Sequence, residues 1–243
     1  MPFFRRFASL TLAGALWSLT PVGASAQTPV SLELVLAVDA SSSVNVAEHR
    51  LQMQGIASAF RSPEVMQLIE GSNGVAVILF QWASRANTEQ TTGWHILKSR
   101  ESILKFAGQV GQTRRVSVGS LTAIGSAIEA GLALLDTNKI EGSRRKIDVS
   151  GDGRSNSGEP LGDMRRLAAS RGVTINGLAI QTDVPDLARY YREEVTVGPD
   201  AFVIAARDYQ DFARAMEAKL LRELSPVVSD RALKPAASAQ VAD

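Results

Sequence analysis

The sequence carries a group of oxygen-bearing side chains directly after an apolar stretch. Residues 34–38 read Leu-Val-Leu-Ala-Val and are followed by Asp39, with hydroxyls at Ser41 and Ser43. This apolar run predicts a strand buried on both faces, so Asp39 falls where the strand leaves the sheet. One carboxylate and two hydroxyls form a hard-oxygen set that suits Mg²⁺ or Mn²⁺. The alternative is a turn whose polar side chains only cap the next helix, and this stretch alone does not decide between the two.

A second aspartate and a threonine fall at comparable places further along the chain. Residues 147–150 predict a strand that leads into Asp152, and Thr122 ends a loop just before a predicted helix. In an open parallel sheet, ligands bind beyond the carboxyl ends of the strands, where the winding reverses. If the two aspartate-bearing strands are neighbours there, the candidate metal ligands are Asp39, Ser41, Ser43, Thr122 and Asp152. The set contains no His or Cys, which favours Mg²⁺ or Mn²⁺ over Zn²⁺.

Alternating strand and helix signals indicate how these residues are positioned. The predicted strands lie near residues 31–38, 75–80, 91–97, 147–150, 173–180 and 202–205. The predicted helices begin near residues 45, 99, 122, 160, 186 and 208, and Asn45 with Glu48 is spaced as a capping box. Such alternation predicts an α/β fold with a doubly wound, mostly parallel sheet and helices on both faces, in one domain.

The motif residues resemble those of a known family. Asp39-Ala40-Ser41-Ser42-Ser43 matches the D-x-S-x-S motif of von Willebrand factor A domains, and Thr122 and Asp152 match that family's remaining metal ligands. The resemblance covers roughly residues 30–224, and residues 148–153 resemble a bacterial secreted branch of the family. It implies a metal-ion-dependent adhesion site and a strand order of 3-2-1-4-5-6, with one antiparallel edge strand at residues 91–97. Gly119-Ser120-Leu121-Thr122 departs from the family's usual Gly-Thr, so Thr113 is the alternative hydroxyl ligand.

The resemblance implies a binding function rather than catalysis. In the family, the open position on the ion takes a carboxylate from a partner protein, so an Asp or Glu on a protein partner is expected here. One alternative is a scaffold domain whose metal only stabilises the fold. Another is a hydrolase that uses His49 or His95, although the sequence has no G-x-S-x-G nucleophile motif.

The first 26 residues resemble a secretory signal. Arg5 and Arg6 precede an apolar stretch, and Ala24-Ser25-Ala26 fits a cleavage site before Gln27. We therefore expect a periplasmic or extracellular protein without a transmembrane segment, with a binding domain over residues 27–224 and a disordered tail over 225–243. Removing the two arginines changes the formal net charge from +1 to −1, which gives no support for nucleic-acid binding. Cysteine is absent, so no disulfide is expected, and we expect a monomer.

Overall fold

Apolar runs in the sequence form one mixed β-sheet in the computed structural model, which describes residues 27–88, 91–116 and 119–225. Its strands are β2 (Leu32–Asp39), β3 (Val75–Trp82), β4 (Ala86–Asn87), β5 (His95–Leu97), β7 (Arg145–Gly151), β8 (Val173–Ile180) and β9 (Val203–Ala206). The order is β4-β3-β2-β7-β8-β9, and β5 also pairs with β3. Both β4 and β5 run antiparallel to β3, whereas the other pairs are parallel.

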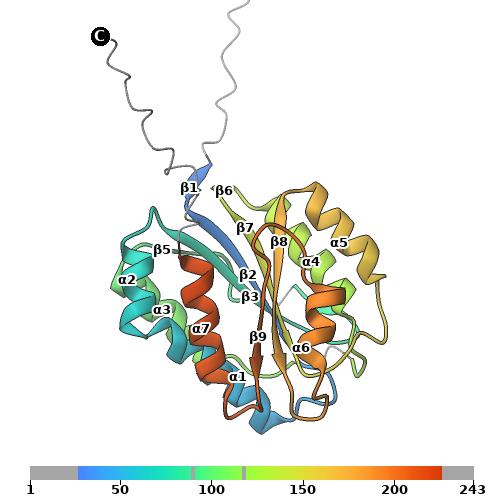
Figure 1. Cartoon of the computed structure of the whole chain (residues 1–243). Helices are drawn as coiled ribbons and strands as arrows, with labels where there is room; N and C mark the ends of the chain where they lie inside the picture. The colour runs from blue at the N-terminus through green and yellow to red at the C-terminus, as the bar shows by residue number, and fades with distance from the viewer. Residues whose placement is uncertain (1–26, 89–90, 117–118, 226–243) are drawn as a thin grey trace, which may run out of the picture.

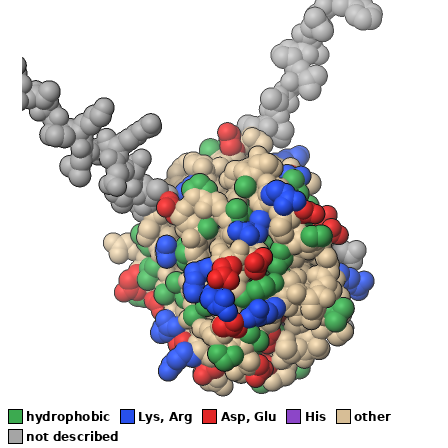
Figure 2. Space-filling view, turned by 45° about the vertical axis from the view of Figure 1, so that its right-hand side comes forward, with side chains coloured by type: hydrophobic (Ala, Val, Ile, Leu, Met, Phe, Trp, Pro, Cys, Tyr) green, Lys and Arg blue, Asp and Glu red, His purple; other side chains and the backbone are tan. Residues whose placement is uncertain are grey.

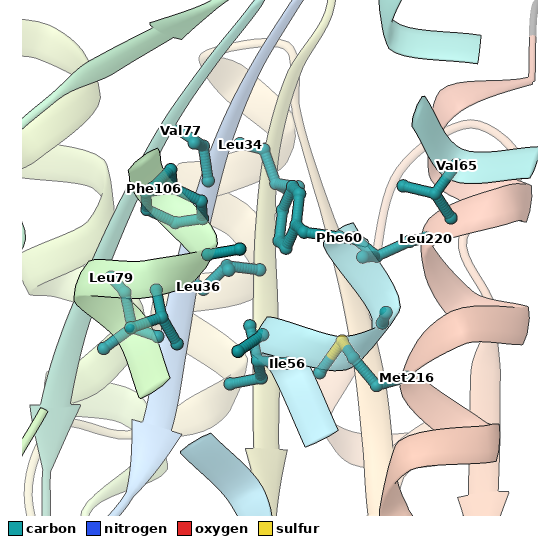
Figure 3. Close-up of a cluster of buried hydrophobic side chains, with 14 of the residues drawn as sticks. Leu34, Leu36, Ile56, Phe60, Val65, Val77, Leu79, Phe106, Met216 and Leu220 are labelled. Atoms are coloured by element: carbon teal, nitrogen blue, oxygen red, sulfur yellow. The ribbon is translucent and has the colours of Figure 1, made fainter. Parts of the chain in front are cut away.

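Helices cover both faces of this sheet (Figure 1). They are α1 (Val46–Phe60), α2 (Pro63–Glu70), α3 (Arg100–Gly111), α4 (Ile124–Thr137), α5 (Leu161–Ser170), α6 (Leu187–Tyr190), a π-helical turn (Tyr191–Val195) and α7 (Phe212–Leu224). One layer contains α1, α2, α3 and α7, and the other contains α4, α5 and α6. On the first face, apolar side chains of α1, α3 and α7 pack against those of β2 and β3 (Figure 3). This burial of apolar surface fixes the central strands in place.

The structure confirms the predicted fold class and strand order. Counted among the six predicted strands, β5-β3-β2-β7-β8-β9 is the order 3-2-1-4-5-6, with an antiparallel strand at the β3 edge. The capping box also forms: Asn45 Oδ1 accepts the N–H groups of Ala47 and Glu48, and Glu48 Oε2 accepts the Asn45 N–H. The fold class and the capping box follow from signals that lie close together in the sequence, whereas the strand order was implied by the resemblance to von Willebrand factor A domains.

Three predicted elements differ in extent. The edge strand is limited to β5, because Gly93 adopts φ +71° and the Thr92 hydroxyl, rather than a backbone carbonyl, accepts the Leu79 N–H. The helix expected to begin near residue 186 divides into α6 and the π-helical turn. The last helix begins at Phe212, because Asp208 Oδ1 accepts the Asp211 N–H and holds a turn before it.

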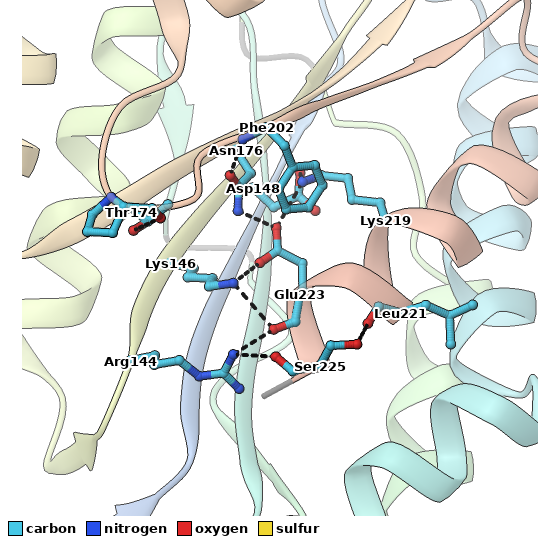
Figure 4. A network of polar contacts seen from close by, with 11 residues as sticks. Arg144, Lys146, Asp148, Thr174, Asn176, Phe202, Lys219, Leu221, Glu223 and Ser225 are labelled. Atoms are coloured by element: carbon cyan, nitrogen blue, oxygen red, sulfur yellow. Dashed lines mark hydrogen bonds and ion pairs between the residues drawn. The ribbon is translucent and has the colours of Figure 1, made fainter. Parts of the chain in front are cut away.

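A buried ionic network fastens α7 to the sheet (Figure 4). The fully buried Lys219 Nζ lies 3.0 Å from Asp148 Oδ1 and 3.0 Å from Glu223 Oε1. Lys146 Nζ lies 2.7 Å from Glu223 Oε2, and Asn176 donates a 2.6 Å hydrogen bond to Glu223 Oε1. We call these five residues the lysine network. Its two carboxylates face two ammonium groups, so its charges are balanced within the protein.

The two ends of the described body lie together, opposite the carboxyl ends of the parallel strands (Figure 1). There, β1 (Thr28–Val30) pairs in parallel with β6 (Ile140–Gly142). Ser143 donates its N–H to the last carbonyl of β1 at 3.0 Å, and the adjacent Arg144 donates to the Ser225 carbonyl at 3.0 Å. No helix in the part of the chain that the structure describes is long and apolar enough to cross a membrane. Residues 1–26 and 226–243 lie outside the described residues, so the signal peptide, the tail and the limits of the domain remain predictions.

Candidate metal centre

The two aspartates come from neighbouring parallel strands at the middle of the sheet. β2 ends at Asp39, and β7 ends at Gly151, directly before Asp152. The two strands are paired in parallel, so their carboxyl ends lie side by side. The chain winds outward in opposite directions from this pair, which is the switch point where open α/β sheets bind ligands. The sequence alone predicted this placement only on the condition that the strands are neighbours.

The turn after β2 gathers the motif side chains. The Ser41 N–H donates to Asp39 Oδ1 at 2.7 Å, and the Ser41 and Ser43 hydroxyl oxygens lie 3.0 Å apart. Ser43 Oγ donates to Asp152 Oδ1 at 2.7 Å, which joins the two strand ends. The helix that follows is capped by Asn45 instead. The two hydroxyls therefore do not serve as caps of α1, and the turn-only alternative loses its main support.

Thr122 lies against the loop that carries Asp152. Its N–H donates to Asn156 Oδ1 at 2.8 Å, and its carbonyl accepts the Asn156 N–H at 2.9 Å. A Cβ atom placed on Gly153 would stand 3.6 Å from Thr122 Oγ1. The alternative hydroxyl, that of Thr113, donates to the Gln109 carbonyl at 3.1 Å instead, at the end of α3. The geometry therefore favours Thr122 as the threonine of the centre, in spite of the leucine before it.

The two carboxylates are buried without a basic partner in the described part of the chain. Asp39 is 0% exposed and Asp152 is 6% exposed. Burial raises the pKa of Asp39 to about 7; the Ser41 N–H opposes this rise, and the charge of Asp152 adds to it. Asp39 Oδ2 is also buried without a hydrogen-bond partner among the described residues. These properties fit a divalent cation, which would neutralise both carboxylates.

The donor set is limited to oxygen atoms. Within the described ranges, no group of three or more His, Cys, Asp or Glu side chains gathers as a metal cluster. A cation at this centre would therefore depend on hydroxyl oxygens beside the two carboxylates. Hydroxyl and carboxylate donors are the ligands of hard ions such as Mg²⁺ and Mn²⁺.

Three residues that the sequence did not assign to this centre lie at it. Tyr209, which falls in the helix predicted to begin near residue 208, donates its hydroxyl to Asp152 Oδ2 at 2.9 Å. Tyr191 lies beside Asp39, because a Cβ on Gly151 would stand 2.8 Å from both Tyr191 Oη and Asp39 Oδ2. Arg115 donates to the Ala40 and Ser41 carbonyls at 2.7 and 2.8 Å. These contacts join residues that are far apart in the sequence. The one signal that could have found any of them is the strand order, which places the loop that carries Tyr209 at this end of the sheet.

The two histidines have packing environments. His49 is buried in α1, and burial lowers its pKa; the Gln81 side chain opposes this shift and Arg115 adds to it. His95 lies on β5, where its ring packs against Phe106 with centroids 5.3 Å apart and Nε2 lies 3.1 Å from the Thr92 carbonyl. The ring of His95 is thus held by packing and by Thr92, whereas His49 Nε2 is buried without a hydrogen-bond partner among the described residues.

Several solved structures share this fold at low sequence identity. Proximal thread matrix protein 1 of the mussel byssus is 16% identical with a TM-score of 0.57, covering 82% of this chain and 47% of that chain, so this chain spans about half its length. The pilus adhesin SpaC from Lactobacillus rhamnosus GG is 16% identical with a TM-score of 0.57, covering 81% of this chain and 30% of that chain. The vWF domain of the type V pili tip protein Mfa5 from Porphyromonas gingivalis is 9% identical with a TM-score of 0.53, covering 79% of this chain and 95% of that domain.

One of these proteins has been solved with a metal. A second structure of the byssus protein, 19% identical with a TM-score of 0.55 and covering 82% of this chain and 46% of that one, is described as having a zinc-occupied MIDAS motif. Comparison with curated protein sequences gives no match. The fold is thus that of a von Willebrand factor A domain. The model of the family described as "Protein of unknown function (DUF1194)" matches residues 29–228, which is most of the chain, and the protein therefore belongs to that family.

Proposed function

We propose that this protein is an exported binding module that recognises a carboxylate on a partner protein through a bound Mg²⁺ or Mn²⁺ ion. The ligands would be Asp39, Ser41, Ser43, Thr122 and Asp152. The observation that carries the proposal is the pair of buried aspartates, which meet at the switch point with hydroxyls around them and no ion pair to a described basic residue. Leaving two carboxylates buried and uncompensated is costly, so the arrangement is that of a site built for a cation.

The charge of the site explains why a partner carboxylate would bind. Two aspartates balance the charge of a divalent ion, and three neutral hydroxyls complete its protein ligands. Mg²⁺ prefers six oxygens at about 2.0–2.1 Å, so a position remains for water or for an incoming carboxylate. A partner Asp or Glu would then meet a centre that is neutral yet coordinatively incomplete. The pilus adhesin and the pili tip protein with the same fold are consistent with such a role.

We infer recognition rather than turnover from the same charge balance. An ion whose charge two aspartates offset keeps less positive charge to activate a water molecule. His49 is buried in α1 and His95 packs on Phe106, so neither is placed as the base of a hydrolase. The remaining alternative is a domain whose metal only stabilises the fold.

On the face shown in Figure 2, basic and acidic side chains are interspersed, and no basic patch of the kind that binds nucleic acid stands out.

Metal binding is tested by calorimetric titration with Mg²⁺ and Mn²⁺. Asp39→Ala and Asp152→Ala should each abolish or sharply weaken binding, because each leaves an unbalanced ligand set. Asp163→Ala is the matched control, since Asp163 is exposed on α5 and forms only a surface ion pair with Arg166. Titration curves that are unchanged in both site variants would place the metal elsewhere.

Recognition is tested by affinity purification from a cell-envelope extract, in Mg²⁺ and in EDTA. We expect a partner with an exposed Asp or Glu at its contact loop, retained in Mg²⁺ and released by EDTA. Substituting that acidic residue should abolish retention. A partner that binds equally well in EDTA and to Asp39→Ala would show that the metal is structural and that recognition uses another surface.

Export is tested separately from metal binding. We propose cleavage before Gln27 and a periplasmic or extracellular location, on the basis of the paired arginines, the apolar stretch and Ala24-Ser25-Ala26. Mass spectrometry of the mature N-terminus should find Gln27 as the first residue. A chain that retains Met1 and remains in the cytosol would contradict the proposal.

A further inference from the structure

All three tyrosines of this chain direct their hydroxyls at the loops that carry the two aspartates. The sequence contains three tyrosines in 243 residues. Tyr209 precedes α7 and bonds to Asp152, Tyr191 opens the π-helical turn beside Asp39, and Tyr190 accepts the Ser155 N–H at 3.2 Å. They come from two regions of the chain, yet their hydroxyls gather beyond the carboxyl ends of the central strands. This concentration is the observation from which the inference starts.

Tyr209 and Ser43 each donate a hydrogen bond to one carboxylate oxygen of Asp152. The Tyr209 hydroxyl donates to Oδ2 at 2.9 Å, and the Ser43 hydroxyl donates to Oδ1 at 2.7 Å. Oδ1 is thereby turned toward the side chains of the D-x-S-x-S turn, while Oδ2 is held on the far side. Tyr209 is 3% exposed, so solvent competes little for this hydrogen bond.

Tyr191 occupies a slot that two glycines leave open. A Cβ on Gly177 of β8 would stand 2.7 Å from the Tyr191 ring, and a Cβ on Gly151 of β7 would stand 2.8 Å from its hydroxyl. The same Cβ position on Gly151 is also 2.8 Å from Asp39 Oδ2. Tyr191 Oη and Asp39 Oδ2 therefore lie no further apart than twice 2.8 Å. The backbone here is a π-helical turn, a conformation that often marks functional sites. The sheet is thus shaped to let this hydroxyl approach Asp39.

The Tyr191 hydroxyl has no other assigned use. It is fully buried and has no hydrogen-bond partner among the described residues, and Asp39 Oδ2 is in the same condition. A buried hydroxyl without a partner is unfavourable, and a phenylalanine would fill the same slot without that cost. The presence of a tyrosine at this position is therefore explained if its hydroxyl forms a hydrogen bond when a cation is bound at the centre.

We propose that Tyr191 and Tyr209 are positioning residues, one for each aspartate of the metal centre. Tyr209 holds Asp152 through Oδ2, and Tyr191 donates to Asp39 Oδ2 when the ion is bound, so that each carboxylate presents a fixed orientation to the cation. Ligand carboxylates are in general oriented by such outer hydrogen bonds, whose loss weakens metal affinity about 10–100-fold. This inference rests on the proposed metal binding and adds the groups that orient the ligands.

The test compares Tyr→Phe variants in two measurements. Calorimetric titration with Mg²⁺ should show about 10–100-fold weaker binding for Tyr191→Phe and for Tyr209→Phe. Urea unfolding in EDTA should separate them: Tyr191→Phe should be at least as stable as the wild type, whereas Tyr209→Phe should unfold at lower urea, because it removes an existing hydrogen bond. Weaker binding without loss of metal-free stability is a result that a merely structural tyrosine does not give.

Tyr190→Phe is the matched control. It removes a hydroxyl from the adjacent residue, one that contacts the Ser155 backbone rather than an aspartate, and Mg²⁺ affinity should stay within about threefold of the wild type, below the range expected for an orienting group. Wild-type Mg²⁺ affinity in Tyr191→Phe and Tyr209→Phe would overturn this proposal alone. A wild-type protein that binds neither Mg²⁺ nor Mn²⁺ would overturn the proposed function together with it.

Discussion

The sheet holds two buried pairs of carboxylates that differ in how their charge is compensated. In the lysine network, Asp148 and Glu223 lie against the ammonium groups of Lys219 and Lys146. In the candidate metal centre, Asp39 and Asp152 face hydroxyl groups and each other. Both pairs draw one member from β7 or from the residue after it. The same strand thus contributes to one pair that is neutralised by the protein and to one that is not.

Burial raises the pKa of one aspartate in each pair, and the two pairs differ in the charged groups that act on those pKa values. Burial raises the pKa of Asp148 to about 6 although Lys219 opposes it, whereas the pKa of Glu223 is lowered because Lys219 and Lys146 outweigh the effect of burial. The pKa of Asp39 rises to about 7, and the charged neighbour that contributes is another carboxylate. A buried carboxylate that lacks a resident cation must be protonated or must bind a cation from solution. The comparison therefore shows that the lysine network is neutralised within the protein, and it supports the proposal that Asp39 and Asp152 bind a cation from solution.

The largest expected effect comes from removing the resident cation. Lys219→Met leaves Asp148 and Glu223 buried with one ammonium group between them, and should lower the free energy of unfolding by about 3–5 kcal/mol. Urea denaturation measures this change. Lys105→Met, on the exposed face of α3, is the control and should change stability by less than about 0.5 kcal/mol. A loss below about 1 kcal/mol for Lys219→Met would mean that the two carboxylates do not depend on their resident cation.

Adding a cation should have the opposite effect on the other pair. At an Mg²⁺ concentration 100 times its Kd, the wild type should gain about 2.7 kcal/mol of stability, because the ion binds only the folded state. Asp152→Asn should lose this gain, and Lys219→Met should keep it, since that substitution leaves the five proposed metal ligands in place. Thermal unfolding in Mg²⁺ and in EDTA measures both. A full gain in Asp152→Asn would assign the stabilisation to another site.

The metal-free centre should also make stability depend on pH. The pKa of Asp39 is raised from 3.8 to about 7 in the folded state, so folding favours the protonated carboxyl. Its contribution is complete below about pH 4 and is lost as pH rises through 7, by at most about 1.4 kcal/mol per pH unit. Urea unfolding in EDTA from pH 5 to 8 should therefore show a fall in the wild type relative to Asp39→Asn. Saturating Mg²⁺ should remove that difference, and parallel pH curves in EDTA would contradict the assignment.

The smallest expected effect concerns a single hydroxyl. Ser43→Ala removes the 2.7 Å hydrogen bond to Asp152, and should cost about 1 kcal/mol of stability and weaken Mg²⁺ binding without unfolding the domain. Ser42→Ala is the matched control, because the Ser42 hydroxyl donates to the Ser120 carbonyl at 2.9 Å. Its Mg²⁺ affinity should stay that of the wild type. Equal affinities in the two variants would remove Ser43 from the proposed ligand set.

Much of this arrangement was predictable because its signals are local. The buried strand before Asp39, the capping box at Asn45 and the alternation of elements each depend on residues close in sequence. The sheet order that the structure confirms was instead implied by the resemblance to von Willebrand factor A domains. Asp39, Ser41 and Ser43 share one turn, so their convergence follows from a short motif. Asp152 required one further step, the adjacency of β2 and β7.

The rest depends on packing between distant segments. Lys219 and Glu223 are four residues apart and suggest a surface ion pair, but their burial against Asp148 emerges only when α7 covers the sheet. Tyr191 depends on the π-helical turn and on a glycine in each of two strands, none of which has a recognisable pattern by itself. Tyr209 is buried, and nothing in the sequence around it indicates the carboxylate of Asp152 with which its hydroxyl bonds.

The location of the chain ends has a consequence for how the metal centre is presented. β1 and the residue after α7 are hydrogen-bonded to the adjacent residues Ser143 and Arg144, at the end of the strands opposite the loops that carry the proposed metal ligands. A protein tethered through either end of this body would orient those loops away from its support. If the protein is coupled to a sensor surface through a C-terminal tag, the centre should therefore stay accessible to metal and partner. A longer linker at either end would move the centre further from the support without changing its structure.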